Sequence, residues 1–346
     1  MRTPLPEALE SLVISQDGVL TRAQALHHGL TKGQFDGLAD QGWQRLVWGV
    51  YSRAGAGLVQ RASAGVLAAG DSACVGGLAA AALHGFHDRP VSVIEIWTPS
   101  AHVGRTSTGR SGTSSSGTTE AGRTGTTASS GTTDAGYQWL YRRGLRESTG
   151  LPRRTTPAET IVDLAGGASL DDLVGWVTRA VRLGLTSPEQ IRHALGRRLR
   201  VPGRANLERM LNWVEFGIES PLEMRYVRDV ERAHGLPRGT PQVSKSARTR
   251  TDMVYDKWST LVELDGQLGH RGVHETRDAG RDARHLAQGL ATLRFGWADV
   301  AHRPCTTAQL VGQVFRNQGW KGKLKLCPQC TPPPDESPWP PDPQAR

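Results

Sequence analysis

One low-complexity stretch divides this chain of 346 residues and limits where a folded core can form. Residues 103–136 are almost only Gly, Ser, Thr and Ala, with a few charged residues. Such a segment buries too little apolar surface to offset the entropy lost on ordering, so it is predicted to be a flexible insertion. Strand-like patterns lie on either side of it, at residues 91–97 and 137–141, which indicates that the insertion interrupts one sheet.

The length and charge of the chain predict a basic protein with two or three domains. The formal net charge of +9 at pH 7 favours a polyanionic partner such as nucleic acid, although an Arg-rich translation of a GC-rich genome would give the same charge. No apolar run reaches the length of a signal-peptide core or a membrane span. Four cysteines are too few for a disulfide framework. A cytoplasmic location without a membrane partner is therefore expected.

Residues 1–55 carry the pattern of a compact DNA-binding domain. Capping threonines predict helices over residues 22–28 and 32–41, and alternation over residues 43–53 predicts a two-stranded wing. A helix, a helix–turn–helix and a hairpin in this order are typical of a winged helix, whose second paired helix enters the major groove. The alternative is a winged helix that makes only protein contacts. The residues predicted to contact DNA are Lys32, Gln34 and Arg45.

Residues 56–205 are predicted to form a small α/β middle domain around the insertion. Thr156 and Pro157 mark a helix start, and amphipathic patterns predict further helices over residues 171–183 and 188–198. Arginines crowd the end of this domain and either follow a phosphate backbone or form a solvated helix face. These arginines are Arg192, Arg197, Arg198, Arg200, Arg204 and Arg209.

Three short motifs give the first half of the chain its family resemblance. They are Gly18-Val19-Leu20-Thr21, Gly49-Val50-Tyr51, and Thr156-Pro157 followed by Asp163-Leu164-Ala165. With these motifs, roughly residues 8–200 resemble the AbiEi-type antitoxin family of bacterial abortive-infection systems, whose members carry an N-terminal winged helix. The resemblance implies DNA binding and a toxin–antitoxin context without catalysis. A cognate toxin and a second copy of the chain, as a homodimer, stay open as protein partners.

Three carboxylates converge in the second half of the chain. Residues 251–266 read as two strands joined by a turn, which is the pattern of a β-hairpin. A turn centred between Lys257 and Trp258 sets Asp252 opposite Glu263 on one face. The two-residue period of a strand places Asp265 on the same face.

Facing carboxylates require an explanation, because like charges across two strands destabilise a sheet and raise each other's pKa. A hard divalent cation removes the conflict, since Mg²⁺ prefers carboxylate oxygens, water and substrate phosphate. In phosphodiester hydrolysis such an ion stabilises charge on the phosphoryl oxygens and lowers the pKa of the attacking water. The alternative is a solvent-facing acidic hairpin that Arg248, Arg250 or Lys257 neutralises.

Five short motifs lie within about a hundred residues of this half of the chain, and their order and spacing form a pattern. Together they resemble the PD-(D/E)XK nuclease superfamily, specifically its Vsr-like endonuclease domains. The motifs are Ser220-Pro221-Leu222-Glu223, Thr251-Asp252, Val262-Glu263-Leu264-Asp265-Gly266 with His270, Arg277-Asp278-Ala279-Gly280-Arg281-Asp282, and Leu293-Arg294-Phe295.

The resemblance implies a catalytic site. In it, Asp252 and Glu263 bind Mg²⁺ or Mn²⁺, and Glu223 supports them from its helix. His270 is the candidate for carrying a proton or orienting water. The superfamily pattern has Lys two residues after the Glu, where this chain has Asp265. Because of this departure, a domain that binds DNA without cutting it stays open as an alternative.

Two further basic residues belong to the expected DNA-binding set. Arg277 and Arg281 stand one helical turn apart, where they either hold a scissile phosphate or pair with Asp278 and Asp282.

A pair of cysteines near the end of the chain has the spacing of a zinc knuckle. Cys327 and Cys330 enclose two residues, but a tetrahedral zinc site needs two more ligands, for which Cys305 and His302 are the nearest candidates. The alternative is two free thiols. The Pro-rich residues 331–346 are predicted to be a disordered tail.

These observations predict an α/β (α+β) protein in four parts. They are a winged helix (1–55), a middle α/β domain (56–205), a Vsr-like endonuclease domain (206–326), and a tail with the cysteine pair (327–346). The expected function is metal-dependent hydrolysis of DNA phosphodiester bonds, in phage defence or mobile-element biology. A non-catalytic antitoxin or transcriptional regulator is the alternative, and an RNA-directed nuclease stays open because basic charge does not distinguish DNA from RNA.

Overall fold

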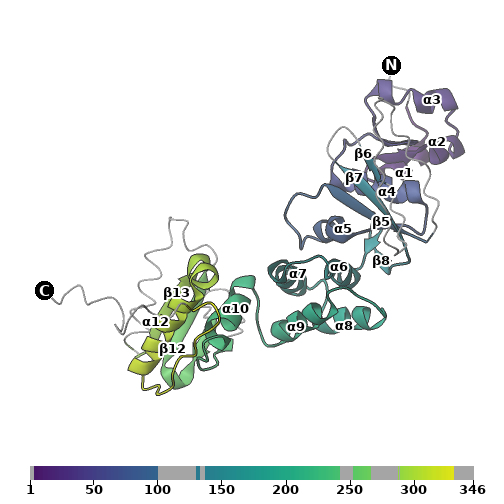
Figure 1. Cartoon of the computed structure of the whole chain (residues 1–346). Coiled ribbons are helices and arrows are strands. Elements are labelled where there is room, and N and C mark those ends of the chain that lie inside the picture. Colours follow the sequence, from purple (N-terminus) through teal and green to yellow (C-terminus); the bar gives the residue numbers. More distant parts are fainter. Residues whose placement is uncertain are drawn as a thin grey trace, which may run out of the picture. The chain divides into compact units, whose positions relative to one another are not determined.

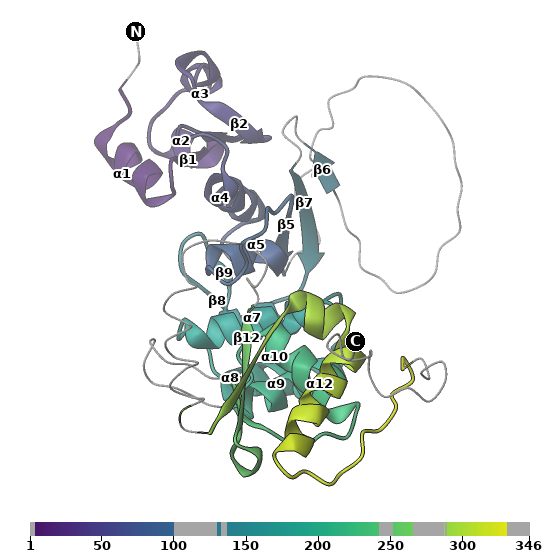
Figure 2. The same cartoon turned by 90° about the vertical axis from the view of Figure 1, so that its left-hand side faces the viewer.

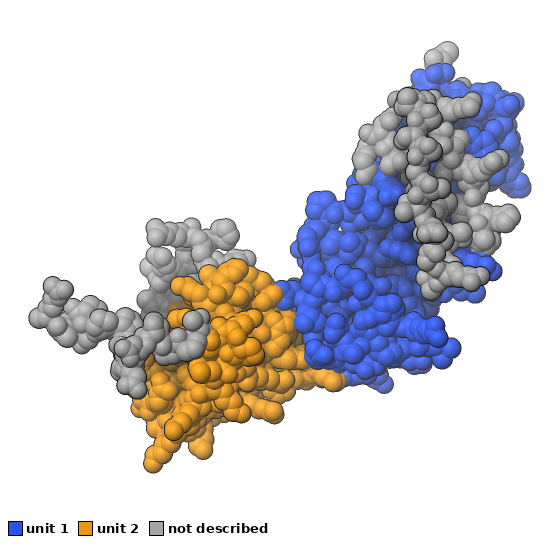
Figure 3. All heavy atoms as spheres, in the orientation of Figure 1, with its two compact units in different colours: residues 1–211 blue, residues 212–346 orange. Residues whose placement is uncertain are grey.

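The computed structural model describes residues 4–99, 130–132, 137–241, 252–265, 287 and 289–330. Within these ranges the chain is a mixed α/β protein with three sheets (Figure 1), which confirms the predicted fold class. It divides into two compact units, residues 1–211 and residues 212–346 (Figure 3). The division falls inside helix α9 (Arg204–Glu215), close to the boundary expected from the sequence.

Unit 1 begins with three helices and a small sheet. The sheet has the order β1-β3-β2, and both of its pairings are antiparallel. The elements are α1 (Glu7–Ser15), β1 (Val19–Thr21), α2 (Arg22–His27), α3 (Lys32–Asp36), the 3-10 helix η1 (Ala39–Gln41), β2 (Gln44–Val47) and β3 (Val50–Ser52).

The predicted helix starts are confirmed. Thr21 and Thr31 each accept a hydrogen bond from the backbone N–H three residues later, and the side-chain oxygens of Gln24 and Gln34 accept one from the capping residue's N–H. These are capping boxes that satisfy the first donors of both helices. The wing differs from the prediction because β1 joins it as a third strand, with Val19 fully buried.

The parts expected as separate domains, 1–55 and 56–205, share one core. Helix α4 (Leu58–Ala69) packs against all three strands of the small sheet and also against strand β5 (Val93–Thr98) of the next one. Buried residues from both sheets therefore form one apolar cluster. They include Val19, Leu46, Val50, Ala62, Ile94, Ile96 and Trp139.

The second sheet of unit 1 has six strands in the order β6-β7-β5-β4-β9-β8. Figure 2 shows β6, β7 and β5 side by side in this sheet. Strand β7 (Gln138–Arg143) pairs in parallel with β5, which confirms that the insertion interrupts a sheet. Strand β6 (Ser130–Thr132) pairs with β7, so three residues of the predicted unstructured insertion extend the sheet. The rest of the insertion lies outside the described residues. The other strands are β4 (Cys74–Gly76), β8 (Ser148–Thr149) and β9 (Arg154–Thr155).

Helices α5 to α8 and the first part of α9 complete unit 1, and three arginines near their ends are tied into the fold. Arg198 bonds the buried carboxylates of Glu159 and Asp163, and Arg197 also bonds Glu159. Arg204 donates to the carbonyls of residues 195 and 198. These three guanidiniums hold helix ends together, a role that neither sequence-based alternative for this cluster included. The helices are α5 (Gly77–Leu83), α6 (Pro157–Leu164), α7 (Leu170–Arg182) and α8 (Pro188–Gly196).

Unit 2 is built on a mixed sheet of four strands in the order β10-β11-β12-β13. The first two pairings are antiparallel, and β12 pairs with β13 in parallel. Its elements are α10 (Pro221–Arg225), the π-helix η2 (Tyr226–Arg232), β10 (Thr240–Pro241), β11 (Met253–Tyr255), the 3-10 helix η3 (Asp256–Trp258), β12 (Thr260–Asp265), β13 (Ala291–Gly296), the π-helix η4 (Ala298–His302) and α12 (Pro304–Asn317).

Aromatic side chains fill the core of unit 2. Tyr255 packs on Phe315 with ring centroids 4.8 Å apart, and Tyr226 stacks on Phe295 at 6.3 Å. The hydroxyl of Tyr255 donates to Glu231 at 2.8 Å and lies 3.1 Å from that of Tyr226. The helices η2 and α12 therefore cover the sheet face that carries Tyr255 and Phe295.

Candidate functional site

The acidic hairpin, defined as Asp252 with β11, η3 and β12, has the predicted register. Tyr255 pairs with Thr260 and Met253 pairs with Val262, across a turn formed by residues 256–259. Asp252 directly precedes the Met253 pair, so continuation of this register sets it opposite Glu263. The turn works because Ser259 adopts a left-handed conformation with φ of 43°.

The carboxylates of the acidic hairpin lie on the face opposite the aromatic core. Alternation along β12 places Val262 on the face of Tyr255 and puts Glu263 and Asp265 on the other. Glu263 is buried, with 7% of its surface exposed, whereas Asp265 at the end of the strand is exposed. The buried glutamate therefore needs compensation from neighbouring groups.

Asp252 and Glu263 each accept a hydrogen bond from another protein group at one carboxylate oxygen. The Leu264 N–H donates to Asp252 Oδ2 at 2.5 Å, and Arg294 Nε donates to Glu263 Oε2 at 2.7 Å. Arg294 is the register partner of Glu263 across the parallel β12–β13 pairing. The sequence-based alternative of a neutralised hairpin named other cations. Of these, Lys257 lies over the Trp258 ring, and Arg248 and Arg250 lie outside the described residues.

Glu223, expected to support the metal ligands, lies on a helix that contacts β12. It is 6% exposed, and its Oε2 accepts a hydrogen bond from the Glu219 N–H at 2.9 Å. Ser220 caps the helix by accepting the Glu223 N–H at 3.1 Å, as predicted. One oxygen of Glu223 thus supports the start of its own helix. The remaining members of the expected set, His270, Arg277 and Arg281, lie outside the described residues.

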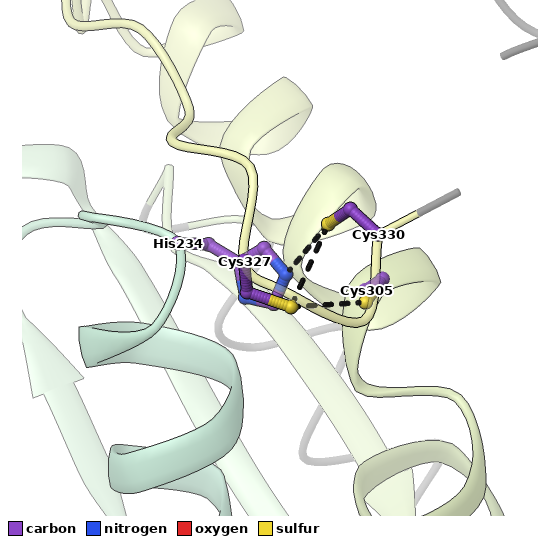
Figure 4. Close-up of side chains that lie close together, drawn as sticks. All are labelled: His234, Cys305, Cys327 and Cys330. Carbon is purple, nitrogen blue, oxygen red and sulfur yellow. Dashed lines mark hydrogen bonds between the residues drawn. The ribbon is translucent and has the colours of Figure 1, made fainter. Parts of the chain in front are cut away.

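Three thiols and one imidazole meet elsewhere in unit 2. This thiol cluster consists of His234, Cys305, Cys327 and Cys330, whose ligand atoms all lie within 4.8 Å of one another (Figure 4). His234 follows η2, Cys305 lies in the first turn of α12, and the other two lie in the loop beyond α12. The thiol cluster could bind a metal such as zinc.

Across the described part of the chain, the thiol cluster is the one place where three or more His, Cys, Asp or Glu side chains approach so closely. The three carboxylates of the acidic hairpin do not gather to that degree. Binding of Mg²⁺ or Mn²⁺ by Asp252 and Glu263 therefore stays a prediction.

The imidazole of the thiol cluster is held in one orientation. His234 is 2% exposed, and its Nδ1 lies 3.0 Å from the Val230 carbonyl oxygen. A carbonyl only accepts, so Nδ1 carries the proton and Nε2 keeps its lone pair. Nε2 lies 3.5 Å from the Cys330 sulfur. The imidazole thus presents an electron pair to the thiols.

The three thiols influence one another's ionisation. Desolvation, together with the side chains of Cys330 and Cys327, raises the pKa of Cys305 to about 12. Desolvation also opposes ionisation of Cys327, but hydrogen bonds from the Gln329 N–H, Cys305 and Cys330 bring its pKa below the ordinary value. Cys327 therefore ionises more readily than Cys305.

The fourth member of the thiol cluster differs from the expected one. His302 was the candidate from sequence spacing, but it is exposed and lies outside the cluster, where His234 stands instead. The cysteine pair also belongs to unit 2 and not to a separate tail. Sequence reasoning missed His234 because it lies far from the three cysteines in the chain.

The predicted DNA contacts of unit 1 occupy exposed positions. Lys32, at the start of α3, and Arg45, on β2, are exposed. Gln34 is exposed too, but its side-chain oxygen accepts the Thr31 N–H at 2.8 Å as part of the helix cap. Trp48, in the turn between β2 and β3, is 65% exposed, which sequence reasoning did not single out.

Comparison with known proteins adds no assignment to this geometry. None of the described helices is both long and apolar enough to cross a membrane. No family model matches the chain, and no curated protein matches it.

Proposed function

We propose that this chain binds DNA and that unit 2 is a metal-dependent endonuclease-like domain that hydrolyses DNA phosphodiester bonds. The setting proposed for this activity is defence against foreign DNA or mobile-element biology. The observation that carries the proposal is the register of the acidic hairpin. It directs Asp252, Glu263 and Asp265 to the sheet face that the aromatic core does not occupy.

The wider architecture of unit 2 supports the same proposal. The sequence resemblance implies an α/β nuclease domain, and the unit is a mixed sheet with α10, η2 and α12 packed on it. Glu223 comes from the helix that contacts β12, which is the origin the resemblance assigns to it.

The donor atoms of the acidic hairpin fit a hard divalent cation. Carboxylate oxygens are the ligands that Mg²⁺ and Mn²⁺ prefer, and the ion would be held by Asp252 and Glu263. Such an ion would supply charge stabilisation at the phosphoryl oxygens. Arg294 bonds Glu263 at 2.7 Å, so it competes with a cation for that carboxylate. Its guanidinium is also suited to a phosphate oxygen once it leaves Glu263.

Unit 1 supplies the proposed DNA-reading surface. Its elements follow the winged-helix order of helix, strand, two helices and two strands. Lys32 and Arg45 offer exposed charges for phosphate contacts, and Gln34 is exposed on the same helix as Lys32 with its oxygen engaged in the cap. An exposed Trp48 at the tip of the wing adds an apolar ring to this surface.

A plasmid-nicking assay with Mg²⁺ or Mn²⁺ tests the proposal. Asp252→Ala and Glu263→Ala are expected to lower the cleavage rate by about 100-fold or more, since each removes a ligand of the catalytic ion. Asp256→Ala is the matched control, because Asp256 is an exposed aspartate in the turn of the same hairpin. It is expected to cut like the wild type.

The outcomes of this assay separate the roles of the two units. Cleavage that survives both substitutions would remove the acidic hairpin from the reaction. Binding to DNA is measured separately with Lys32→Ala and Arg45→Ala. Each is expected to weaken binding and to reduce its salt dependence by about one phosphate contact.

Two features favour a second function, that of a non-catalytic DNA-binding regulator of the antitoxin type. Arg294 occupies the carboxylate of Glu263, and Asp265 stands where the superfamily pattern has Lys. Both features would suit an acidic hairpin that has lost its metal. DNA binding by the wild type without cleavage of any DNA or RNA substrate would favour this function.

A further inference from the structure

We propose that His234, Cys305, Cys327 and Cys330 bind one structural Zn²⁺ ion, which fastens the segment after α12 to the rest of unit 2. The proposal is independent of the nuclease function, because it rests on the thiol cluster and not on the acidic hairpin. It assigns a role to the cysteine pair and to the one buried histidine that faces it (Figure 4).

Three of the six separations between ligand atoms in the thiol cluster match those of a tetrahedral site, and all six lie within 4.8 Å. Zn–S bonds of about 2.3 Å and Zn–N bonds of about 2.05 Å set sulfurs about 3.8 Å apart and a sulfur about 3.6 Å from the nitrogen. The Cys327 sulfur lies 3.6 Å from that of Cys305 and 3.7 Å from that of Cys330. The distance from the Cys330 sulfur to His234 Nε2 is 3.5 Å. Coordination therefore needs only small movements of the four side chains.

The groups around the ligands also suit a metal site. The Val230 carbonyl accepts a hydrogen bond from Nδ1–H of His234, which directs the Nε2 lone pair to the thiols. The Gln329 N–H points at the Cys327 sulfur at 3.4 Å, and the Cys330 N–H bonds the Cys327 carbonyl at 2.9 Å. These bonds fold the Cys-x-x-Cys loop into a turn whose two sulfurs face the same point.

The ligand types select the metal and its role. Three thiolates and an imidazole are soft and borderline donors, which favour Zn²⁺ over Mg²⁺ or Ca²⁺. Four protein ligands fill a tetrahedral shell and leave no position for water or substrate. The ion is therefore structural and not catalytic.

The segment that the ion would fasten has little other means of holding its place. Residues 320–330 contain no helix or strand. Trp320 packs edge-on against Phe315, and the Lys325 N–H bonds the His234 carbonyl at 2.9 Å. Leu324 sits over Gly312, where an added Cβ would lie 3.1 Å from it. A metal bond to three separate parts of unit 2 supplies the constraint that such a coil lacks.

Metal content of the purified full-length protein is the first test. After dialysis against a weak chelator, the wild type is expected to keep about one Zn²⁺ per chain. Cys330→Ser and His234→Ala are expected to lose it. Cys74→Ala and His302→Ala are matched controls and keep the ion, because Cys74 is a buried free cysteine of unit 1 and His302 is an exposed neighbour of Cys305.

Replacement of zinc by Co²⁺ reports the ligand set directly. The wild type is expected to show the intense visible bands of a tetrahedral ion together with sulfur-to-cobalt charge transfer. His234→Cys keeps four ligands, so it is expected to retain the ion and to strengthen the charge-transfer band. This variant distinguishes a lost ligand from a misfolded chain.

The proposal fails if the wild type holds no zinc after dialysis, if Cys330→Ser and His234→Ala keep it, or if the cobalt spectrum is that of an octahedral ion. A chelation experiment on the wild type covers the case in which the variants do not fold. Removal of the ion is expected to speed tryptic cleavage after Lys321, Lys323 and Lys325, and added Zn²⁺ is expected to restore resistance. Equal cleavage rates with and without the ion would overturn the fastening role.

Discussion

The acidic hairpin and the thiol cluster are both proposed metal sites of unit 2, but they differ in how complete they are without an ion. In the acidic hairpin, Arg294 and a backbone N–H already bond the two central carboxylates. In the thiol cluster, the sulfurs lie mainly against one another, and the pKa of Cys305 is raised while that of Cys327 is lowered.

Because of this difference, we expect the acidic hairpin to exchange its ion and the thiol cluster to keep its ion. A carboxylate that a guanidinium can neutralise tolerates the absence of a cation, which suits an ion that arrives with substrate phosphate. Three neighbouring thiols tolerate that absence poorly, which suits an ion that binds once and becomes part of the fold.

Zinc removal is expected to have the largest effect. Structural zinc contributes several kcal/mol to folding, so a chelator is expected to lower the unfolding temperature of unit 2 by about 10 °C or more. Calorimetry with add-back provides the measurement: Zn²⁺ restores the transition and Mg²⁺ does not. The Cys330→Ser protein serves as the control, since its transition no longer responds to the chelator.

If Mg²⁺ restored the unfolding temperature as well as Zn²⁺ does, the proposed difference between the two metal sites would be wrong. Such a result would mean that the acidic hairpin, and not the thiol cluster, provides the metal-dependent stability of this unit.

Removal of the Arg294 guanidinium, which pairs with Glu263, is expected to have an intermediate effect on stability. Arg294→Gln deprives the buried carboxylate of Glu263 of a charged donor, and breaking such a pair costs about 3 kcal/mol. Chemical denaturation measures the loss. The double variant Glu263→Gln with Arg294→Gln is expected to recover most of it, because the charge left uncompensated is then gone.

Mg²⁺ sharpens the same experiment. If the acidic hairpin holds a divalent cation, Mg²⁺ is expected to stabilise Arg294→Gln more than the wild type, since the ion replaces the lost guanidinium. Equal stabilisation of both proteins would argue that the carboxylates bind no ion, and would favour the regulator over the nuclease.

Sequence reasoning was most successful where a feature is local. The caps at Thr21 and Thr31, and the bend that pairs Tyr255 with Thr260, depend on residues a few positions apart. Hydrogen bonds that close so short a loop are specified by the residue types themselves. The carboxylates of the acidic hairpin could therefore be placed on one face without coordinates.

It was least successful where the partner is distant in the chain. Nothing near Cys305 indicates His234, because the two meet only when α12 packs against η2. The contact from Arg294 to Glu263 likewise depends on a parallel pairing between strands that the local pattern does not specify. Long-range packing thus decided the fourth ligand and the compensating cation, while local chemistry decided which residues were candidates.

The carboxylate of Glu231, also in unit 2, provides a reference for the two metal sites. Its substitution is expected to have the smallest effect on stability. Glu231 is 2% exposed and is bonded by neutral donors, the Tyr255 hydroxyl and the Gly239 N–H, both to its Oε2. Burial raises its pKa above the ordinary value, and these hydrogen bonds only partly oppose that rise. The folded state therefore holds this proton more tightly than the unfolded state does.

The sign of the pH dependence follows from that raised pKa. The contribution of Glu231 to stability is fully present below its unfolded pKa of about 4.3 and is lost as the pH rises through the folded pKa. Glu231→Gln keeps an oxygen that accepts both bonds and does not ionise. The unfolding temperature of this variant, minus that of the wild type, is therefore expected to increase from about pH 4 to about pH 7. If the difference stayed constant with pH, the neutral donors would stabilise the Glu231 carboxylate as well as the Arg294 guanidinium stabilises that of Glu263. A charged partner would then not distinguish the acidic hairpin from other buried carboxylates.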